Sequence, residues 1–136
     1  MDIEELIENF SFFENWEEKY QYVIDLGRSL ETLEDCYKTE NCKVQGCQSQ
    51  VWLVPSFKNG IIHFKGDSDA ILVKGIIAIV LLIYNDKSAQ EIKNIDVKNI
   101  FVKLGLEENL TPSRRNGMMS MVEKIRQYAD GATRAD

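Results

Sequence analysis

Histidine is scarce in this chain, and its scarcity removes several kinds of active site. His63 is the only histidine among 136 residues, so a histidine-rich metal site and a Ser–His–Asp triad both lack material. The glycines Gly60, Gly66 and Gly75 do not stand at the spacing of a phosphate-binding loop. The commonest hydrolase and nucleotide-binding motifs are therefore missing.

Basic residues and long apolar runs are also in short supply. Sixteen Lys and Arg face 22 Asp and Glu, which gives a formal net charge of −6, and no basic surface is available for a nucleic acid. The most apolar run, residues 75–84, is about half the length that a membrane span needs. The first five residues are acidic and lack the positive region of a secretory leader. We expect a cytoplasmic protein without nucleic-acid or membrane partners.

The three cysteines, Cys36, Cys42 and Cys47, fall close together. An odd number in a chain without a recognisable leader argues against a disulfide framework. Their spacing matches no C-x2-C knuckle, although His63 or Asp67 would complete a tetrahedral zinc set with the three thiols. We expect neither a metal nor a cofactor, and zinc binding through the thiols stays open as the alternative.

The pattern of apolar residues predicts one α+β domain over residues 1–136. Apolar residues recur at helical spacing in several segments, and Asn15, Gly105 and Thr111-Pro112 are typical of helix ends. Residues 31–43 carry many charges and indicate a loop. The expected helices are the first dozen residues and residues 16–27, 70–84, 88–93, 97–104 and 112–131.

Two strands are expected in the middle of the chain, at residues 50–57 and 60–65. Asn59-Gly60 between them is a strong signal for a tight hairpin turn. Residues 66–69 offer several candidate N-caps for the following helix. We therefore expect a small antiparallel sheet packed against several helices, with the apolar helix 70–84 lying across the hairpin.

The stretch VQGCQSQVWL places Cys47 on a polar turn directly before an apolar strand. Gly46 can adopt positive φ, so the thiol can be presented on a sharp bend. The N–H groups of Gln48 and Ser49, and the Arg114 cation if the fold brings it near, would lower the pKa of the thiol below its usual value of about 8.5. From the residues alone, Cys47 is either a working thiol or a buried structural cysteine.

Four blocks of this sequence resemble the SufE family of sulfur acceptors. One is GCQSQVWL, which contains Cys47. Residues 15–20 (NWEEKY) resemble the N-terminal block of the family, residues 66–75 its central block (GDSDA and VKG), and residues 110–114 (LTPSR) its C-terminal block. The blocks occur in the same order and extend over nearly the whole chain.

The resemblance implies an α+β fold similar to that of IscU-type scaffolds, with the acceptor cysteine on a loop near the sheet. It implies that a pyridoxal-phosphate cysteine desulfurase of the SufS type passes persulfide sulfur to Cys47, and that the sulfur then moves towards an Fe–S scaffold complex. Such a carrier stimulates its desulfurase and has no independent turnover, so whether it counts as an enzyme stays open. The supporting residues are Gly46, Gln48, Ser49, Asp69 and Arg114.

Two other functions stay open. An IscU-like scaffold would bind zinc or a nascent Fe–S cluster through its cysteines, whereas an interaction module would bind a partner whether or not Cys47 is present. The sequence leaves a homodimer of the sulfur acceptor open. Cys42, five residues before Cys47, is a candidate resolving thiol that would trap Cys47 as a disulfide under oxidation.

Overall fold

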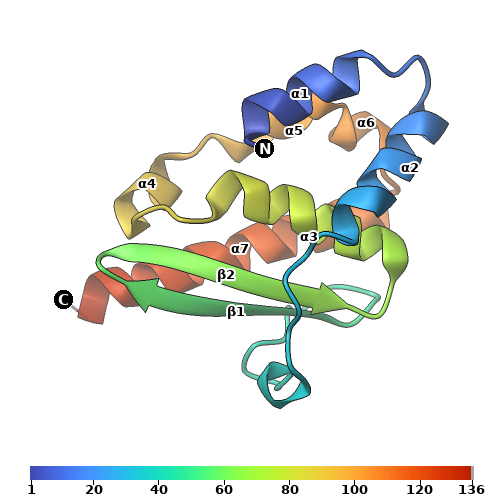
Figure 1. Cartoon of the computed structure of the whole chain (residues 1–136). Helices are drawn as coiled ribbons and strands as arrows, with labels where there is room; N and C mark the ends of the chain where they lie inside the picture. The colour runs from blue at the N-terminus through green and yellow to red at the C-terminus, as the bar shows by residue number, and fades with distance from the viewer. Residues whose placement is uncertain (136) are drawn as a thin grey trace.

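The computed structural model describes residues 1–135 and contains one antiparallel hairpin that packs against helices. Strand β1 (Val51–Lys58) pairs with strand β2 (Ile61–Ser68). The helices are α1 (Ile3–Ser11), α2 (Trp16–Gly27), the 3-10 turn η1 (Asp35–Tyr37), α3 (Ile71–Tyr84), α4 (Ala89–Asn94), α5 (Val97–Leu104), α6 (Leu106–Asn109) and α7 (Pro112–Ala135). Figure 1 shows the hairpin on one side of α3 and α7, with α1, α5 and α6 on the other side. The predicted α+β fold is confirmed.

The hairpin turn forms as the Asn-Gly pair predicts. Asn59 and Gly60 have φ angles of 54° and 79°, and two consecutive positive values are what the tightest hairpin turn requires. The strands pair from Lys58 opposite Ile61 to Val51 opposite Ser68. Strand β2 therefore runs three residues beyond its predicted end, because the start of β1 supplies pairing partners there.

The predicted capping role of residues 66–69 is wrong. The first three of these residues belong to β2, and α3 has Ala70 at its N-cap position without a side-chain hydrogen bond. The Ser68 hydroxyl accepts a hydrogen bond from the Ala70 N–H at 3.2 Å, so it stabilises the turn between strand and helix.

Three other predicted helix ends are confirmed. The Asn15 side chain accepts a hydrogen bond from the Glu18 N–H at 2.9 Å at the start of α2, and α7 starts at Pro112. Gly105 ends α5 with a φ angle of 72°. The short helix α6 after it was not predicted, since four residues are too few to show periodicity.

The core lies around α3, which packs against α2, β2 and α7. Helix α7 contributes the predicted buried stripe of Met118, Val122, Ile125 and Ala129. The predicted end of this helix near Gly131 is wrong, because the helix continues to Ala135. Gly131 has no positive φ angle, so it costs helix propensity but does not turn the chain. Among residues 1–135, none of the helices combines the length and the apolar character that crossing a membrane requires.

Helices α2 and α3 approach each other so closely that only glycine fits at the crossing. A Cβ atom on Gly75 would overlap the carbonyl oxygen of Val23, and one on Gly27 would lie 2.7 Å from the backbone nitrogen of Gly75. Both obstacles are backbone atoms, which cannot swing aside as a side chain does. The two glycines therefore set the distance between α2 and α3.

Gly75→Ala is expected to lower the free energy of unfolding by about 3 kcal/mol, because the added methyl group forces the two helices apart. Urea denaturation measures the change. Gly131→Ala is the matched control, since a Cβ there meets nothing within 4 Å, and it should be neutral or stabilising by up to about 1 kcal/mol. Equal stability of the two variants would contradict the close approach.

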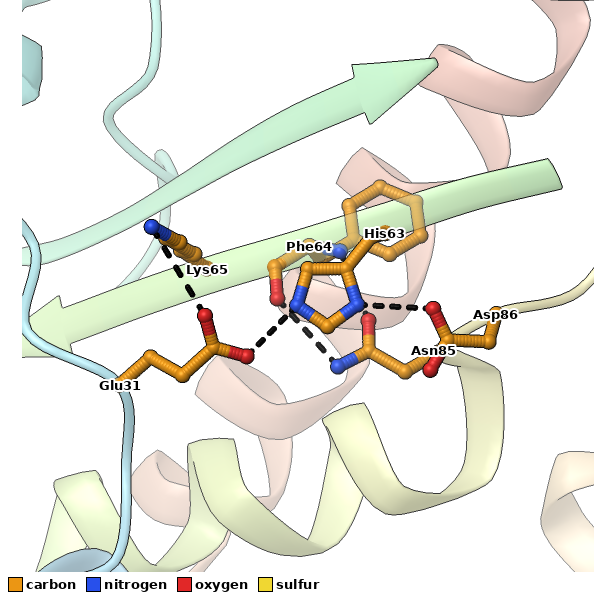
Figure 2. Close-up of polar contacts among 6 residues, drawn as sticks. All are labelled: Glu31, His63, Phe64, Lys65, Asn85 and Asp86. Carbon is orange, nitrogen blue, oxygen red and sulfur yellow. Dashed lines mark hydrogen bonds and ion pairs between the residues drawn. The ribbon is translucent and has the colours of Figure 1, made fainter. Parts of the chain in front are cut away.

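Figure 2 shows that His63 of β2 joins two distant loops to the hairpin. Its Nδ1 atom lies 2.8 Å from Asp86 Oδ1, and its Nε2 atom lies 2.7 Å from Glu31 Oε1. Partial burial lowers the pKa of His63, but the hydrogen bonds and charges of the two carboxylates outweigh it, so the pKa is raised above its ordinary value. His63 is therefore a structural residue here, and its protonated form holds the loops.

The raised pKa of His63 makes the stability of the fold depend on pH. Its contribution should be fully present below the unfolded value of about 6.5 and should be lost as the pH rises through the higher folded value. We expect the difference in unfolding free energy between the wild type and His63→Gln to shrink as the pH rises. Urea denaturation over a range of pH values tests this, and a constant difference would refute it.

Candidate functional site

Cys47 lies on a loop that begins and ends on paired backbone. The Val44 N–H donates to the Val51 carbonyl at 2.8 Å, and the Leu53 N–H donates to the Cys42 carbonyl at 2.9 Å. Val44 and Val51 are both buried, so this pairing is fixed in the core. Residues 45–50 consequently form a short loop that projects from the start of β1.

A second attachment holds the C-terminal side of the loop at the surface. The Gln50 N–H donates to Asp69 Oδ1 at 3.1 Å, and the Asp69 N–H donates back to the Gln50 carbonyl at 3.4 Å. Both residues are exposed. The candidate residue Asp69 is therefore placed to tether the loop, and it does not line the cleft described below.

Gly46 makes the bend that carries the thiol. Its φ angle is +89°, as predicted for a glycine in this turn. A Cβ atom on Gly46 would also lie 2.9 Å from the hydroxyl oxygen of Ser120 on α7. The backbone conformation requires glycine here, and a side chain would also displace the Ser120 hydroxyl.

The Cys47 thiol rests against the backbone of α7. The Cys47 S–H donates to the carbonyl oxygen of Gly117 at an Sγ–O distance of 3.6 Å. A Cβ atom on Gly117 would lie 3.4 Å from Sγ, which is ordinary van der Waals contact, so the glycine leaves free space beside the sulfur. The thiol is half-buried, between the loop and the first turns of α7.

An open cleft of about 470 Å³ lies beside the thiol, between the cysteine loop and the first turns of α3 and α7. Gln48, Ser49 and Arg114 line it together with Cys47. Its apolar walls come from Val73 and Ile76 of α3 and from Met118 and Met121 of α7. Four of the predicted site residues therefore meet at one cleft, and Gly46 and Asp69 support the loop outside it.

The electrostatic setting of Cys47 differs from the expected one. Burial raises the pKa of the Cys47 thiol, and no cation or N–H group offsets it. Hydrogen bonds from the Gln48 and Ser49 N–H groups to Sγ are absent from the part of the chain that the structure describes. The lowering of the pKa that these groups would cause does not occur in this conformation, because burial disfavours the charged thiolate. The resting thiol is protonated and a weak nucleophile at neutral pH.

The structure places the other two cysteines elsewhere. Cys36 is exposed in η1, and Cys42 contacts the hydroxyl group of Tyr128. Tyr128 and Gly117 lie on the same helix eleven residues apart, which corresponds to about 16 Å. Cys42 and Cys47 are free thiols that contact different residues of α7, and the role of Cys42 as a resolving thiol stays a prediction.

A metal site made by the three thiols has no preformed geometry in residues 1–135. Within that range, no cluster of three or more His, Cys, Asp or Glu side chains is arranged to hold a metal ion. The scaffold alternative therefore gains no structural support from the described part of the chain.

Gly117 is a site residue that the sequence analysis missed. A glycine inside an otherwise strong helical pattern costs about 1 kcal/mol relative to alanine, which is a signal that its position serves another purpose. The sequence could not indicate which purpose, because Gly117 and Cys47 are 70 residues apart.

The fold and the site define a small α+β protein with a half-buried thiol on a tethered loop. The family to which the chain belongs is the SufE family: the family model, described as an Fe-S metabolism associated domain, matches residues 4–129. The resemblance noted in the four sequence blocks is thereby confirmed.

Two curated relatives agree with this assignment. An uncharacterized SufE-like protein of Rhizobium meliloti is 43% identical over 133 residues, which cover 95% of each chain. Another from Rhizobium etli is 47% identical over 131 residues, or 93% of this chain and 88% of that one. The solution structure of a hypothetical protein from Thermus thermophilus covers 96% of this chain and 95% of its own with a TM-score of 0.78, and at 16% identity it supports the fold alone.

The burial of Cys47 leads to a direct test. In a protein carrying Cys36→Ser and Cys42→Ser, the thiol of Cys47 should titrate above its value in the unfolded chain, leaving less than about 3% thiolate at pH 7. The pH profile of alkylation by iodoacetamide measures this value, with the urea-unfolded protein as the reference. A profile shifted to lower pH on folding would contradict the burial of the thiol.

Proposed function

We propose that this protein is a sulfur acceptor that takes persulfide sulfur from a pyridoxal-phosphate cysteine desulfurase onto Cys47. The acceptor stimulates the desulfurase by clearing its persulfide and relays the sulfur to Fe–S cluster assembly. The observation that carries the proposal is the position of Cys47, on a loop tethered at its base and seated against α7 beside an open cleft. Membership of a family associated with Fe–S metabolism supports the same function.

The transfer step is an exchange between a thiolate and a persulfide. The Cys47 thiolate attacks the outer sulfur of the persulfide on the desulfurase, and a new S–S bond forms on Cys47. The S–S bond on the desulfurase breaks, and its cysteine leaves as a thiolate that takes up a proton. The sulfur keeps its oxidation state, so no external oxidant or reductant is needed.

The resting conformation favours protection of the thiol over reactivity. Because burial raises the pKa of Cys47, the free acceptor holds few thiolates. Docking would have to move the loop away from Gly117 and bring the sulfur towards a donor or cation. A carrier of this kind reacts on its partner and stays inert towards small molecules elsewhere.

Arg114 is the cation that we expect to stabilise the Cys47 thiolate once the loop has moved outward. It lies at the start of α7, its side chain is exposed, and it lines the cleft together with Cys47. A guanidinium at the rim can stabilise a thiolate that swings outward, and it can also bind a carboxylate of the partner. We assign it a supporting role for that reason.

The proposed partners are those that membership of the SufE family implies. The donor is a cysteine desulfurase of the SufS type, and the recipient is an Fe–S scaffold complex. A cytoplasmic location and a homodimer remain expectations from the sequence.

Incubation with a cysteine desulfurase and free cysteine tests the function. The protein should gain about 32 Da on Cys47, the mass of one sulfur atom, and should raise the rate of the desulfurase. Peptide mass spectrometry and an alanine-release assay measure the two effects.

The other two thiols provide matched controls. Cys47→Ser should abolish both the adduct and the stimulation, whereas Cys36→Ser and Cys42→Ser should preserve both, since neither residue lies at the cleft. Full stimulation by the Cys47→Ser protein would rule out sulfur transfer through this thiol. Loss of function in Cys36→Ser and Cys42→Ser alike would instead favour the three-thiol scaffold.

A further inference from the structure

Gly117 accepts a hydrogen bond from the Cys47 thiol and leaves free space beside its sulfur atom. Its carbonyl oxygen accepts the S–H at 3.6 Å, and its missing side chain faces the sulfur, since a Cβ atom would lie 3.4 Å from Sγ and 3.9 Å from the Cβ atom of Cys47. Gly117 is buried, six residues into α7. Glycine at such a position lowers helix stability relative to alanine, so helix formation does not account for it.

Gly131 of the same helix shows what a glycine without such contacts looks like. It is exposed, and a Cβ atom there would meet nothing within 4 Å. The two glycines have the same intrinsic effect on helix stability, and only Gly117 faces a chemically reactive group.

The space at Gly117 is larger than the bare thiol needs. A methyl group 3.4 Å from Sγ is in ordinary van der Waals contact, so an alanine would fit beside the reduced cysteine. A persulfide carries a second sulfur about 2.0 Å from the first. An outer sulfur on the α7 side would overlap that methyl group, and glycine leaves the position free.

We propose that Gly117 is a positioning residue whose missing side chain provides the seat for the outer sulfur when Cys47 carries a persulfide. The inference rests on the proposed function and deepens it, because it identifies where the carried sulfur is stored. In this seat the outer sulfur is covered by the backbone of α7 and by the neighbouring Met118 and Met121 side chains, which line the same cleft. Gly117 itself makes and breaks no covalent bond.

The seat should determine how long the persulfide survives in the presence of a small reductant. Dithiothreitol attacks the outer sulfur, restores the Cys47 thiol and releases hydrogen sulfide while it closes to its own cyclic disulfide. An outer sulfur that is displaced from the seat is more accessible to this attack. Gly117→Ala should therefore lose its persulfide faster than the wild type, although its bare thiol stays in place.

The experiment compares the wild type, Gly117→Ala and Gly131→Ala, each with Cys36→Ser and Cys42→Ser so that one thiol remains. Each protein is loaded once by a desulfurase with cysteine and once by inorganic polysulfide, whose terminal sulfur passes to the Cys47 thiolate. Intact mass spectrometry then follows the loss of the adduct after addition of dithiothreitol. Alkylation of the unloaded proteins by iodoacetamide and thermal melting are measured on the same preparations.

We expect the adduct on Gly117→Ala to disappear about fivefold faster than on the wild type, the factor that a modest loss of packing produces. Gly131→Ala should match the wild type. Alkylation of the bare thiol should agree within about twofold among the three proteins, and neither variant should melt below the wild type, because alanine is the better helix former.

Two results would contradict the proposal that Gly117 provides the seat for the outer sulfur. The first is equal persulfide lifetimes in Gly117→Ala and the wild type. The second is an equal acceleration of bare-thiol alkylation in Gly117→Ala, which would show that the methyl group expels the whole loop. If the desulfurase with cysteine produces no adduct although polysulfide loads Cys47 normally, the proposed function is refuted. The polysulfide-loaded proteins would still test the role of Gly117.

Discussion

The backbone pairing between residues 42–44 and 51–53 is the constraint on which the site depends. It fixes both ends of a short loop to the same point at the start of β1, and it lies among buried side chains. A loop closed in this way has few conformations to lose, so the position of its thiol costs little further entropy. Helix α7 then supplies the surface on which the loop rests, at Ser120 and Gly117.

The arrangement shields the Cys47 sulfur and makes its thiol less reactive. Burial that shields a sulfur from solvent also raises the pKa of the thiol and reduces the thiolate that must attack. The proposed sulfur transfer therefore needs two positions of the loop, one buried and one presented to a partner. The positive φ of Gly46 gives the loop a residue at which such a change costs little strain.

Much of the fold could be predicted from the sequence, because the signals were local. The Asn59-Gly60 turn, the Asn15 cap and the Gly105 end are decided by residues close together in the chain. The end of β2 was missed because Gly66 and Asp67 resemble turn residues, and only pairing with β1 makes them a strand. Helix α7 passes Gly131 because nothing there requires a left-handed turn.

In the site, too, features set by neighbouring residues could be predicted, and those set by residues far away in the sequence could not. The motif around Cys47 was visible, and the bend at Gly46 followed from it. The pKa of Cys47 was expected to shift in the wrong direction, because the shift comes from burial of the thiol, and that burial depends on contact with α7 around Gly117, 70 residues away. No pattern within the cysteine motif carries that information.

The two attachments of the cysteine loop differ in how easily they can be exchanged. The pairing of Val44 with Val51 is dry, so breaking it would leave buried polar groups without partners, whereas the bond between Gln50 and Asp69 is at the surface, where water can replace it. The hydrogen bonds at the base of the loop are therefore hard to break, whereas those between Gln50 and Asp69 can be exchanged for water. The Gln50–Asp69 side of the loop can therefore open while the pairing at its base stays intact, so the thiol would move outward on that side.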